Sequence, residues 1–276
     1  STFTNAGGDM LWSNVNNWSN GIPNISSAKV ILNDSLIIDK DVEIAQIKLP
    51  GGFGSVHVSS IDNKSLTLNG TGVNAVIQNN GSNVDLRFEL DIKIRSNDSI
   101  EAIQVNAGGS SRIIFRKGSS LDSDRLISIT AGGDKYVMIN DILSSSGLFG
   151  GGVTVMPGSK LVFGENASNY DYMTYFTLLG NAELISRIEE EDFFVKSDFY
   201  IKSLDRNNKG LPNVVTIENG YTMRGSLMVD SVDLILNLHA SQHMEVIELT
   251  SGNLILNLDT AAEFPEVTFL HDGLYS

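Results

Sequence analysis

Short apolar runs recur at a fixed interval near the C-terminal end of the chain. The run Leu234–Leu238 reads Leu-Ile-Leu-Asn-Leu, and the same five residues return twenty positions later as Leu254–Leu258. A related run, Val214–Glu218, lies one period upstream. A second series is interleaved at about the same spacing, at 227–229, 246–249 and 267–270. Two strands in each period predict a β-solenoid, because each coil must return to the same place above the last.

Similar short strands are predicted along most of the chain upstream. They are rich in Val, Ile and Leu and are separated by Asn, Asp, Gly and Pro, which favour turns. The clearest runs are 30–32, 36–38, 42–44, 47–49, 65–68, 75–77, 91–95, 112–115, 126–129, 136–139, 153–155 and 160–163. We therefore expect one all-β domain over residues 1–276, a right-handed parallel β-helix of about a dozen coils with roughly 20–25 residues each. In this register Asn237 and Asn257 stack as a short amide ladder.

Two segments depart from the rhythm of short strands. Residues 1–25 are rich in turn residues and contain both tryptophans, Trp12 and Trp18. An uncovered solenoid end exposes unpaired strand edges, so we expect this segment to form an N-terminal cap in which the tryptophans cover the open end. We expect residues 165–210 to form an irregular insertion, since loops inserted where a coil turns often carry the binding face.

The predicted insertion contains an aromatic cluster, formed by Tyr170, Tyr172, Tyr175 and Phe176. Flat rings of this kind contact both sugars and partner proteins, which makes the cluster a candidate ligand- or partner-binding surface. The competing interpretation is that the rings pack the insertion onto the coil beneath it.

The charge balance is strongly acidic, with a net charge of −14. Such a surface repels phosphate backbones, and Lys and Arg are scattered along the sequence, so nucleic acid is not an expected partner. Attraction of Ca²⁺ fits better; the run Glu189–Asp192 offers hard oxygen ligands, although a solvated acidic surface is the simpler explanation. The chain contains no cysteine, which rules out disulfides and thiolate catalysis. No apolar run approaches the ~20 residues of a membrane helix, so we expect no membrane insertion.

A resemblance to secreted bacterial repeat proteins rests on three segments. Residues 147–163, Gly-Leu-Phe-Gly-Gly-Gly-Val-Thr-Val-Met-Pro-Gly-Ser-Lys-Leu-Val-Phe, resemble the repeat of autotransporter passenger domains, and Ser65–Gly70 matches the same strand–turn element. Trp18–Pro23 looks like the opening of many secreted β-strand-repeat proteins. The resemblance implies a parallel β-helix located outside the cell or on its surface, with the signal sequence removed before Ser1. It is a resemblance to a passenger, since no translocating barrel is present in this sequence.

Many parallel β-helices are polysaccharide lyases or hydrolases. The Trp-Ile-Asp-His element of pectate lyases and the Gly-His-Gly and Arg-Ile-Lys elements of polygalacturonases do not occur here. Asp122 and Asp124 would share one face of a strand, but such a pair is expected by chance among 33 acidic residues. His239 and His243 have the spacing of metal ligands on a helix, whereas here they join two strands. We therefore assign no catalytic residue and no cofactor, with Ca²⁺ as the ion that composition favours.

The sequence favours a non-enzymatic extracellular or cell-surface protein, such as an adhesin, a fibre or a sheath subunit. It would act through contact with surface glycans or through self-association into oligomers or filaments. The alternative is a carbohydrate-active β-helix, either a polysaccharide lyase or hydrolase or a phage-tailspike-like depolymerase. Its groove would lie beside residues 165–210, with carboxylates and a basic residue such as Arg187 or Lys196 taking part.

Overall fold

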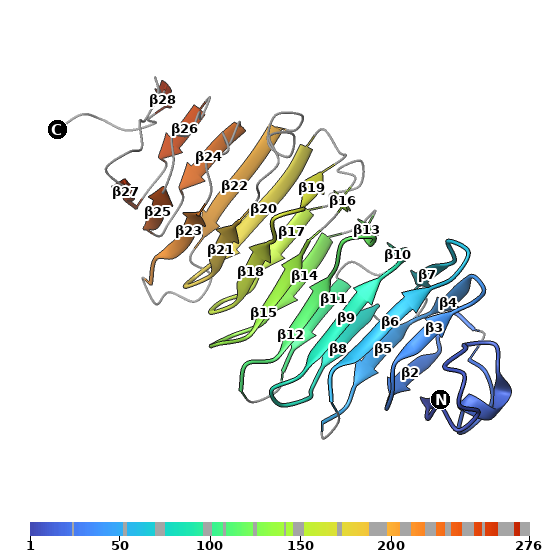
Figure 1. The fold of residues 1–276 in the computed structure, drawn as a ribbon. Coiled ribbons are helices and arrows are strands. Elements are labelled where there is room, and N and C mark those ends of the chain that lie inside the picture. The colour runs from blue at the N-terminus through green and yellow to red at the C-terminus, as the bar shows by residue number, and fades with distance from the viewer. Residues whose placement is uncertain are drawn as a thin grey trace.

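The computed structural model describes most of the chain, and its strands pair in parallel. The described residues are 1–23, 25–51, 54–69, 75–95, 101–106, 109–123, 126–140, 142–145, 152–169, 173–187, 198–204, 211–218, 225–229, 233–238, 246–249, 252–258 and 268–270. Within them the one helical element is the single 3₁₀ turn η1 (Val15–Asn17). The fold is a parallel β-solenoid, as the sequence repeat predicts, and its coils stack along one axis from the blue N-terminal end to the orange and red C-terminal end (Figure 1).

Three sheets run side by side along the axis. Sheet A contains, in spatial order, β1 (Thr2–Phe3), β2 (Lys29–Leu32), β5 (Gln46–Leu49), β8 (Val76–Asn79), β11 (Glu101–Val105), β14 (Leu126–Thr130), β17 (Gly152–Val155), β20 (Met173–Leu179), β22 (Asp198–Leu204), β24 (Gly225–Val229), β26 (Val246–Leu249) and β28 (Thr268–Leu270).

Sheets B and C complete the coils. Sheet B contains β3 (Leu36–Ile38), β6 (Val56–Ser60), β9 (Asp85–Glu89), β12 (Arg112–Phe115), β15 (Tyr136–Ile139), β18 (Lys160–Phe163), β21 (Glu183–Ser186), β23 (Asn213–Ile217), β25 (Leu234–Leu238) and β27 (Leu254–Leu258). Sheet C contains β4 (Val42–Ile44), β7 (Ser65–Leu68), β10 (Asp91–Ile94), β13 (Ser120–Ser123), β16 (Ile142–Ser145) and β19 (Ser168–Asn169).

The coils change shape along the axis. From β2 to β19 the chain passes through sheets A, B and C in turn, which makes six three-sided coils. From β20 onward, the described strands belong to sheets A and B alone, so the later coils are two-sided in the part of the chain that the structure describes. The step between stacked residues varies along the axis. It is 17 residues from Val30 to Ile47, 30 from Ile47 to Ile77 and 26 from Ile77 to Ile103. Among the described strands of the later coils it is 31 residues from Leu184 to Val215 and then 21 and 20, so the expected 20–25 residues hold for only part of the solenoid.

Residues 165–210, where we expect an irregular insertion, form regular strands wherever the structure describes them; residues 170–172, 188–197 and 205–210 lie outside the described ranges. β19, β20, β21 and β22 all lie in this segment, and β20 pairs with β22 along seven residues, from Met173 opposite Asp198 to Leu179 opposite Leu204. Both strands are seven residues long, against two to five in every strand before them. Among the described residues, the change in the sequence rhythm coincides with the end of sheet C and with the longer strands of sheet A.

The core consists of apolar columns that the register places inside the solenoid. On sheet A, Ile77, Ile103 and Ile129 lie one above another and are at most 1% exposed. On sheet B the ring of Phe88 stacks on that of Phe115, with centroids 5.4 Å apart. Each such side chain contributes roughly 1.5–3 kcal/mol of burial free energy, so every coil is stabilised by its neighbours on both sides.

The identical pentapeptides stack in the register that the sequence predicts. Leu234 pairs with Leu254, and the pairing continues residue by residue to Leu238. The expected amide ladder is confirmed, since Asn257 Nδ2 donates to Asn237 Oδ1 at 2.8 Å.

The N-terminal segment packs on the first coil. β1 pairs with β2, and Leu11 forms a bridge with Ile37 in β3. Trp12 and Trp18 are both buried, and their rings meet edge to face at 4.6 Å, while the indole N–H of Trp18 donates to the backbone carbonyl of Trp12 at 2.8 Å. The two tryptophans therefore lie at the end of the apolar stack, with their large apolar surfaces inside it.

A buried polar side chain fixes the first two-sided coils. The amide of Asn213 is fully buried; its Nδ2 donates to the carbonyl of Leu178 at 3.1 Å and to Ser203 Oγ at 2.8 Å. Its Oδ1 accepts from the backbone N–H of Ala182 at 2.8 Å. Asn213 thus links β20, β22 and the start of β21, where the third sheet ends in the described residues.

We expect the substitution Asn213→Ala to lower the free energy of unfolding by at least about 2 kcal/mol, because each buried group left without a partner costs about 1–3 kcal/mol. Asn237→Ala is the matched control: it removes an amide from an outward-facing ladder, where water replaces the lost bonds. Urea denaturation at constant m-value measures both changes. Equal shifts of the two midpoints would contradict the structural role of Asn213.

Candidate functional site

The aromatic residues that the sequence singles out do not form a described surface cluster. Phe176 is fully buried in the core, where its ring meets Phe163 edge to face at 5.5 Å, so it does not belong to a binding surface. Tyr175 pairs with Tyr200 through the backbone of β20 and β22. Tyr170 and Tyr172 lie outside the described residues. For Phe176, the competing interpretation as core packing is the correct one.

Other candidates from the sequence also find structural explanations or fall outside the described residues. Arg187 pairs with Glu218 at 2.8 Å, and Asp122 pairs with Arg95. Asp124, Lys196, His239, His243 and the acidic run 189–192 lie outside the described ranges. In the part of the chain that the structure describes, no group of three His, Cys, Asp or Glu side chains is placed to hold a metal ion.

A polar hollow on the outside of the solenoid is the best candidate site. It has a volume of about 340 Å³ and lies where the chain turns from sheet A into sheet B. Its walls are formed by Ser55, Asn83, Asp85, Arg87, Ser110, Arg112 and Tyr136. We call this hollow the arginine pocket.

Three of its residues come from one outward-facing column. Asp85, Arg112 and Tyr136 are the first residues of β9, β12 and β15, and the register places Arg112 opposite both of the others. Strands alternate their side chains between the two faces, so the apolar partners next in each strand point into the core while these three point outward.

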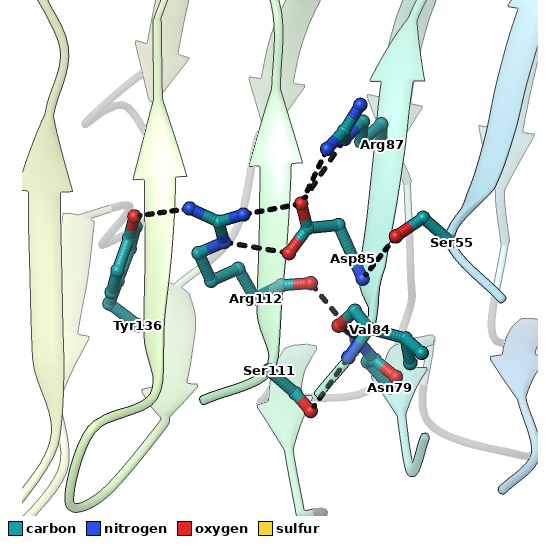
Figure 2. A network of polar contacts seen from close by, with 8 residues as sticks. All are labelled: Ser55, Asn79, Val84, Asp85, Arg87, Ser111, Arg112 and Tyr136. Carbon is teal, nitrogen blue, oxygen red and sulfur yellow. Dashed lines mark hydrogen bonds and ion pairs between the residues drawn. The ribbon is translucent and has the colours of Figure 1, made fainter. Parts of the chain in front are cut away.

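The centre of the pocket is a carboxylate held by two guanidinium groups (Figure 2). The side chain of Asp85 is only 4% exposed. Arg112 binds it in a bidentate manner, with Nε 2.6 Å from Oδ1 and Nη2 2.6 Å from Oδ2. Arg87 donates to Oδ2 from Nη2 at 2.7 Å. Arg112 also donates from Nη1 to the hydroxyl of Tyr136 at 3.0 Å, and its guanidinium lies 5.7 Å from the centre of that ring.

A second set of hydrogen bonds holds the strand starts that carry these side chains. The buried amide of Asn79 donates to the carbonyls of Val84 and Arg112, at 3.0 and 2.9 Å. Ser55 Oγ accepts from the backbone N–H of Asp85 at 3.1 Å. The first residues of β9 and β12 are therefore fixed from both sides, which positions the ion pair before any ligand is present (Figure 2).

The electrostatics of the pocket leave a positive surplus. Burial alone would raise the pKa of Asp85, but the hydrogen bonds from Arg112 and Arg87 outweigh it, and the pKa lies below its ordinary value. The bonds to Asp85 and Tyr136 raise the pKa of Arg112. Asp85 and Arg112 are therefore both charged at neutral pH. One carboxylate against two guanidinium groups gives a net charge of one positive, in a chain whose net charge is −14.

A second, charge-balanced ion pair lies on the same face. Arg116 lies 3.4 Å from Glu89, and His57 Nε2 lies 3.2 Å from the same carboxylate. Arg87, Arg112 and Arg116 are three of the eight arginines in the chain, and all lie on β9 or at β12. The interpretation of basic residues as scattered holds along the sequence, but the register gathers these three.

The sequence contains a signal that could have located the pocket. Aligning Asp-Leu-Arg-Phe-Glu (Asp85–Glu89) with Arg-Ile-Ile-Phe-Arg (Arg112–Arg116) superposes the two phenylalanines. The same alignment brings Asp85 beside Arg112 and Glu89 beside Arg116. The offset of 27 residues differs from the twenty of the C-terminal repeat, so that repeat does not reveal it.

The chemistry of the arginine pocket suits binding. The partly exposed guanidinium groups, 41% for Arg87 and 37% for Arg112, keep donors free to face solvent beyond those used on Asp85. Guanidinium groups bind carboxylates through two parallel hydrogen bonds, and Asn83, Ser55 and Tyr136 supply further polar contacts. Asp85 is held as an ion by two cations, which is unfavourable for donating or accepting a proton in a reaction.

Comparison of the chain with protein-family models, with curated proteins and with solved structures gives no match. Fold and site together therefore define the class: a parallel β-solenoid with a preorganised, cationic polar pocket on its outer face. Among the described residues, no helix has the length and apolar character needed to cross a membrane.

The ion pair predicts a pH-dependent contribution to stability. The folded-state pKa of Asp85 is lowered, so the pair stabilises the fold above the unfolded-state pKa of about 3.9 and the stabilisation is lost as pH falls through the lower folded value. We expect Asp85→Asn to cost about 1.5–3 kcal/mol at pH 7, the range for hydrogen bonds to charged groups, with a cost that shrinks below about pH 4.

Urea midpoints of both proteins, measured from neutral to acid pH, test this dependence. Asp62→Asn, at an exposed turn, is the matched control and should show a small difference at every pH. A cost of Asp85→Asn that stays constant down to the lowest pH at which the fold persists would contradict the assigned ion pair.

Proposed function

We propose that this chain is a non-enzymatic β-solenoid displayed outside the cell or on its surface, where it acts as an adhesin-like protein that binds an acidic glycan. The arginine pocket carries this proposal. A locally cationic, hydrogen-bonding hollow on an otherwise strongly acidic molecule selects a ligand that has both a carboxylate and hydroxyl groups. An acidic sugar combines the two.

The shape and charge of the pocket favour an acidic sugar over an anion that has no hydroxyl groups. The walls alternate cations with hydroxyl and amide groups from Ser55, Asn83, Ser110 and Tyr136, which match the many hydroxyls of a sugar ring. A polyphosphate chain offers phosphate oxygens but no neutral hydroxyl groups for these walls to bind. A carboxylated sugar places one charge in the pocket and its neutral hydroxyls around it.

The location outside the cell rests on the sequence resemblance and on the fold. Residues 147–163 resemble the repeat of autotransporter passenger domains, and long Asn- and Ser-rich solenoids of this type are predominantly extracellular. A rigid rod built from stacked coils suits the display of a binding site at a distance from its attachment.

The carbohydrate-active alternative receives less support from the pocket. Hydrolysis of a glycosidic bond needs two carboxylates across the sugar, and Asp85 is the one carboxylate among the described residues that line the pocket. It is engaged by Arg87 and Arg112. Product analysis after long incubation with acidic polysaccharide distinguishes binding from cleavage, and the release of shorter products would overturn the non-enzymatic proposal.

Calorimetric titration with an oligogalacturonate tests the binding function. We expect binding that weakens as salt rises, because part of the attraction is between exposed charges. Arg87→Gln and Arg112→Gln should each weaken it by about tenfold or more. Tyr136→Phe keeps the ring and removes only the hydroxyl, so its smaller effect separates loss of a contact from misfolding. Arg95→Gln removes a cation that pairs with Asp122 and should leave affinity unchanged.

Two further ligands test whether the carboxylate and the sugar hydroxyls are each needed for binding. A neutral cello-oligosaccharide of the same length should bind weakly, because it lacks the carboxylate. An oligoglutamate has carboxylates but no sugar hydroxyls. Equal binding of oligoglutamate and oligogalacturonate would replace the glycan by an acidic peptide. No binding of oligogalacturonate by the unmodified protein would contradict the proposed function.

Self-association is the second mode of contact, favoured by one observation. β27 is the outermost described strand of sheet B, and its inward-facing residues Leu254 and Leu256 are only half-buried, whereas Leu234 and Leu236 beside them are fully buried. An edge with exposed apolar positions accepts a further strand. Light scattering should show oligomers that Leu256→Lys disperses. The same measurement in millimolar Ca²⁺ tests whether calcium promotes association. A protein that stays monomeric with and without Ca²⁺ would contradict both self-association and its dependence on calcium.

A further inference from the structure

A second hollow lies further along the same corner of the solenoid. It has a volume of about 220 Å³, and its walls include Gly133, Gly158, Lys160, Asn181 and Glu183. Like the arginine pocket, it lies where sheet A turns into sheet B, and it is lined by the turns that precede β15, β18 and β21 and by the first residues of β18 and β21.

One column of side chains joins the two hollows. Arg112 pairs with Asp85 on one side and with Tyr136 on the other. Val137 pairs with Leu161, so Lys160 follows Tyr136 in the column, and Glu183 follows Lys160. These first residues of β9, β12, β15, β18 and β21 read acid, cation, tyrosine, cation, acid.

The order of charges along the column is symmetric about the tyrosine. Asp85 binds Arg112 on one side, and Glu183 binds Lys160 at 2.9 Å on the other. Both carboxylates lie at the outer ends, while both cations flank Tyr136. Lys160 is 28% exposed and Arg112 is 37% exposed, so neither cation is closed off by its acid. The middle of the column therefore presents an aromatic ring between two partly exposed cations, each paired with a carboxylate on its outer side.

From this arrangement we propose that the two hollows are subsites of one groove, which binds an extended acidic oligosaccharide with its chain parallel to the solenoid axis. This inference rests on the proposed function and specifies its ligand. Neighbouring strands lie about 4.8 Å apart, so Arg112 and Lys160, two strands apart, are separated by roughly 10 Å. One strand spacing is close to the advance of a single pyranose in an extended chain, so carboxylates on alternate sugars match the two cations.

A glycine in the turn that precedes β15 forms part of the wall of the second hollow. Gly133 has a φ of +71°, and a Cβ built there would meet no atom within 4 Å. A side chain at this position would thus extend into open space beside the second hollow. Asn adopts positive φ at little cost, so Gly133→Asn adds bulk to the groove with no change of charge.

The length dependence of binding tests the groove. Calorimetric titration of the unmodified protein with galacturonate dimers, tetramers and hexamers would give the affinity for each length. A groove predicts that affinity rises by about tenfold or more from dimer to hexamer, whereas a single pocket is saturated by the shorter ligand.

Variants separate the groove from the pocket. Lys160→Gln and Gly133→Asn should weaken hexamer binding by about fivefold or more and leave dimer binding within about twofold, because the dimer fits the arginine pocket alone. Arg112→Gln should weaken both. Lys40→Gln, at an exposed turn between β3 and β4, is the matched control and should change neither.

The outcomes distinguish the two proposals. Affinity that does not depend on ligand length would contradict the groove but not the arginine pocket. Unchanged hexamer affinity in both Lys160→Gln and Gly133→Asn would do the same. If the unmodified protein binds no galacturonate of any length, the proposed function fails and the groove with it. Circular dichroism and urea midpoints of each variant show whether a lost affinity reflects a lost fold.

Discussion

Every feature of this molecule depends on the in-register stacking of each coil on the previous one. A strand's side chains alternate between core and solvent, so a slip of one residue would turn a whole strand inside out. The columns of isoleucine on sheet A, such as Ile77, Ile103 and Ile129, make that slip costly in every coil at once. The register that stacks the core residues also determines which outward-facing residues lie beside one another, without changing the apolar surface that is buried.

The arginine pocket shows what such an outward column makes possible. A carboxylate as buried as that of Asp85 is unfavourable alone, because desolvation favours its neutral form. It is stabilised here because Arg112 stands opposite it in the next strand and Arg87 two residues further along its own. Asn79 and Ser55 hold the backbone at these strand starts. The fold thus holds both guanidinium groups in place, which would lower the entropy cost of binding the proposed ligand.

The sequence predicts the fold better than the site. The identical pentapeptides at 234–238 and 254–258 predict that each residue pairs with the one twenty positions later. The structure has this register, including the hydrogen bond between Asn237 and Asn257. Upstream, strands share only their apolar alternation, so the sequence predicts neither the variable step, such as 30 residues from Ile47 to Ile77, nor the third sheet. At 165–210 the sequence predicts an insertion, and the described part of this segment contains the long strands β20 and β22. The sequence period does not reveal the centre of the pocket because Asp85 and Arg112 meet through a step of 27 residues, outside the expected 20–25.

The column that carries the candidate site changes in character along the solenoid. After Glu183 the same outward position is occupied by Val214, Ile235 and Ile255. Apolar outward positions place no charge beside a ligand, so the charged part of the column is confined to the coils between β9 and β21. The core columns continue through both parts, with Leu184, Val215 and Leu236 beneath them. Inner columns thus determine that the coils stack, and outer columns are free to differ from coil to coil, which is how a repetitive fold can hold a site that is not repeated.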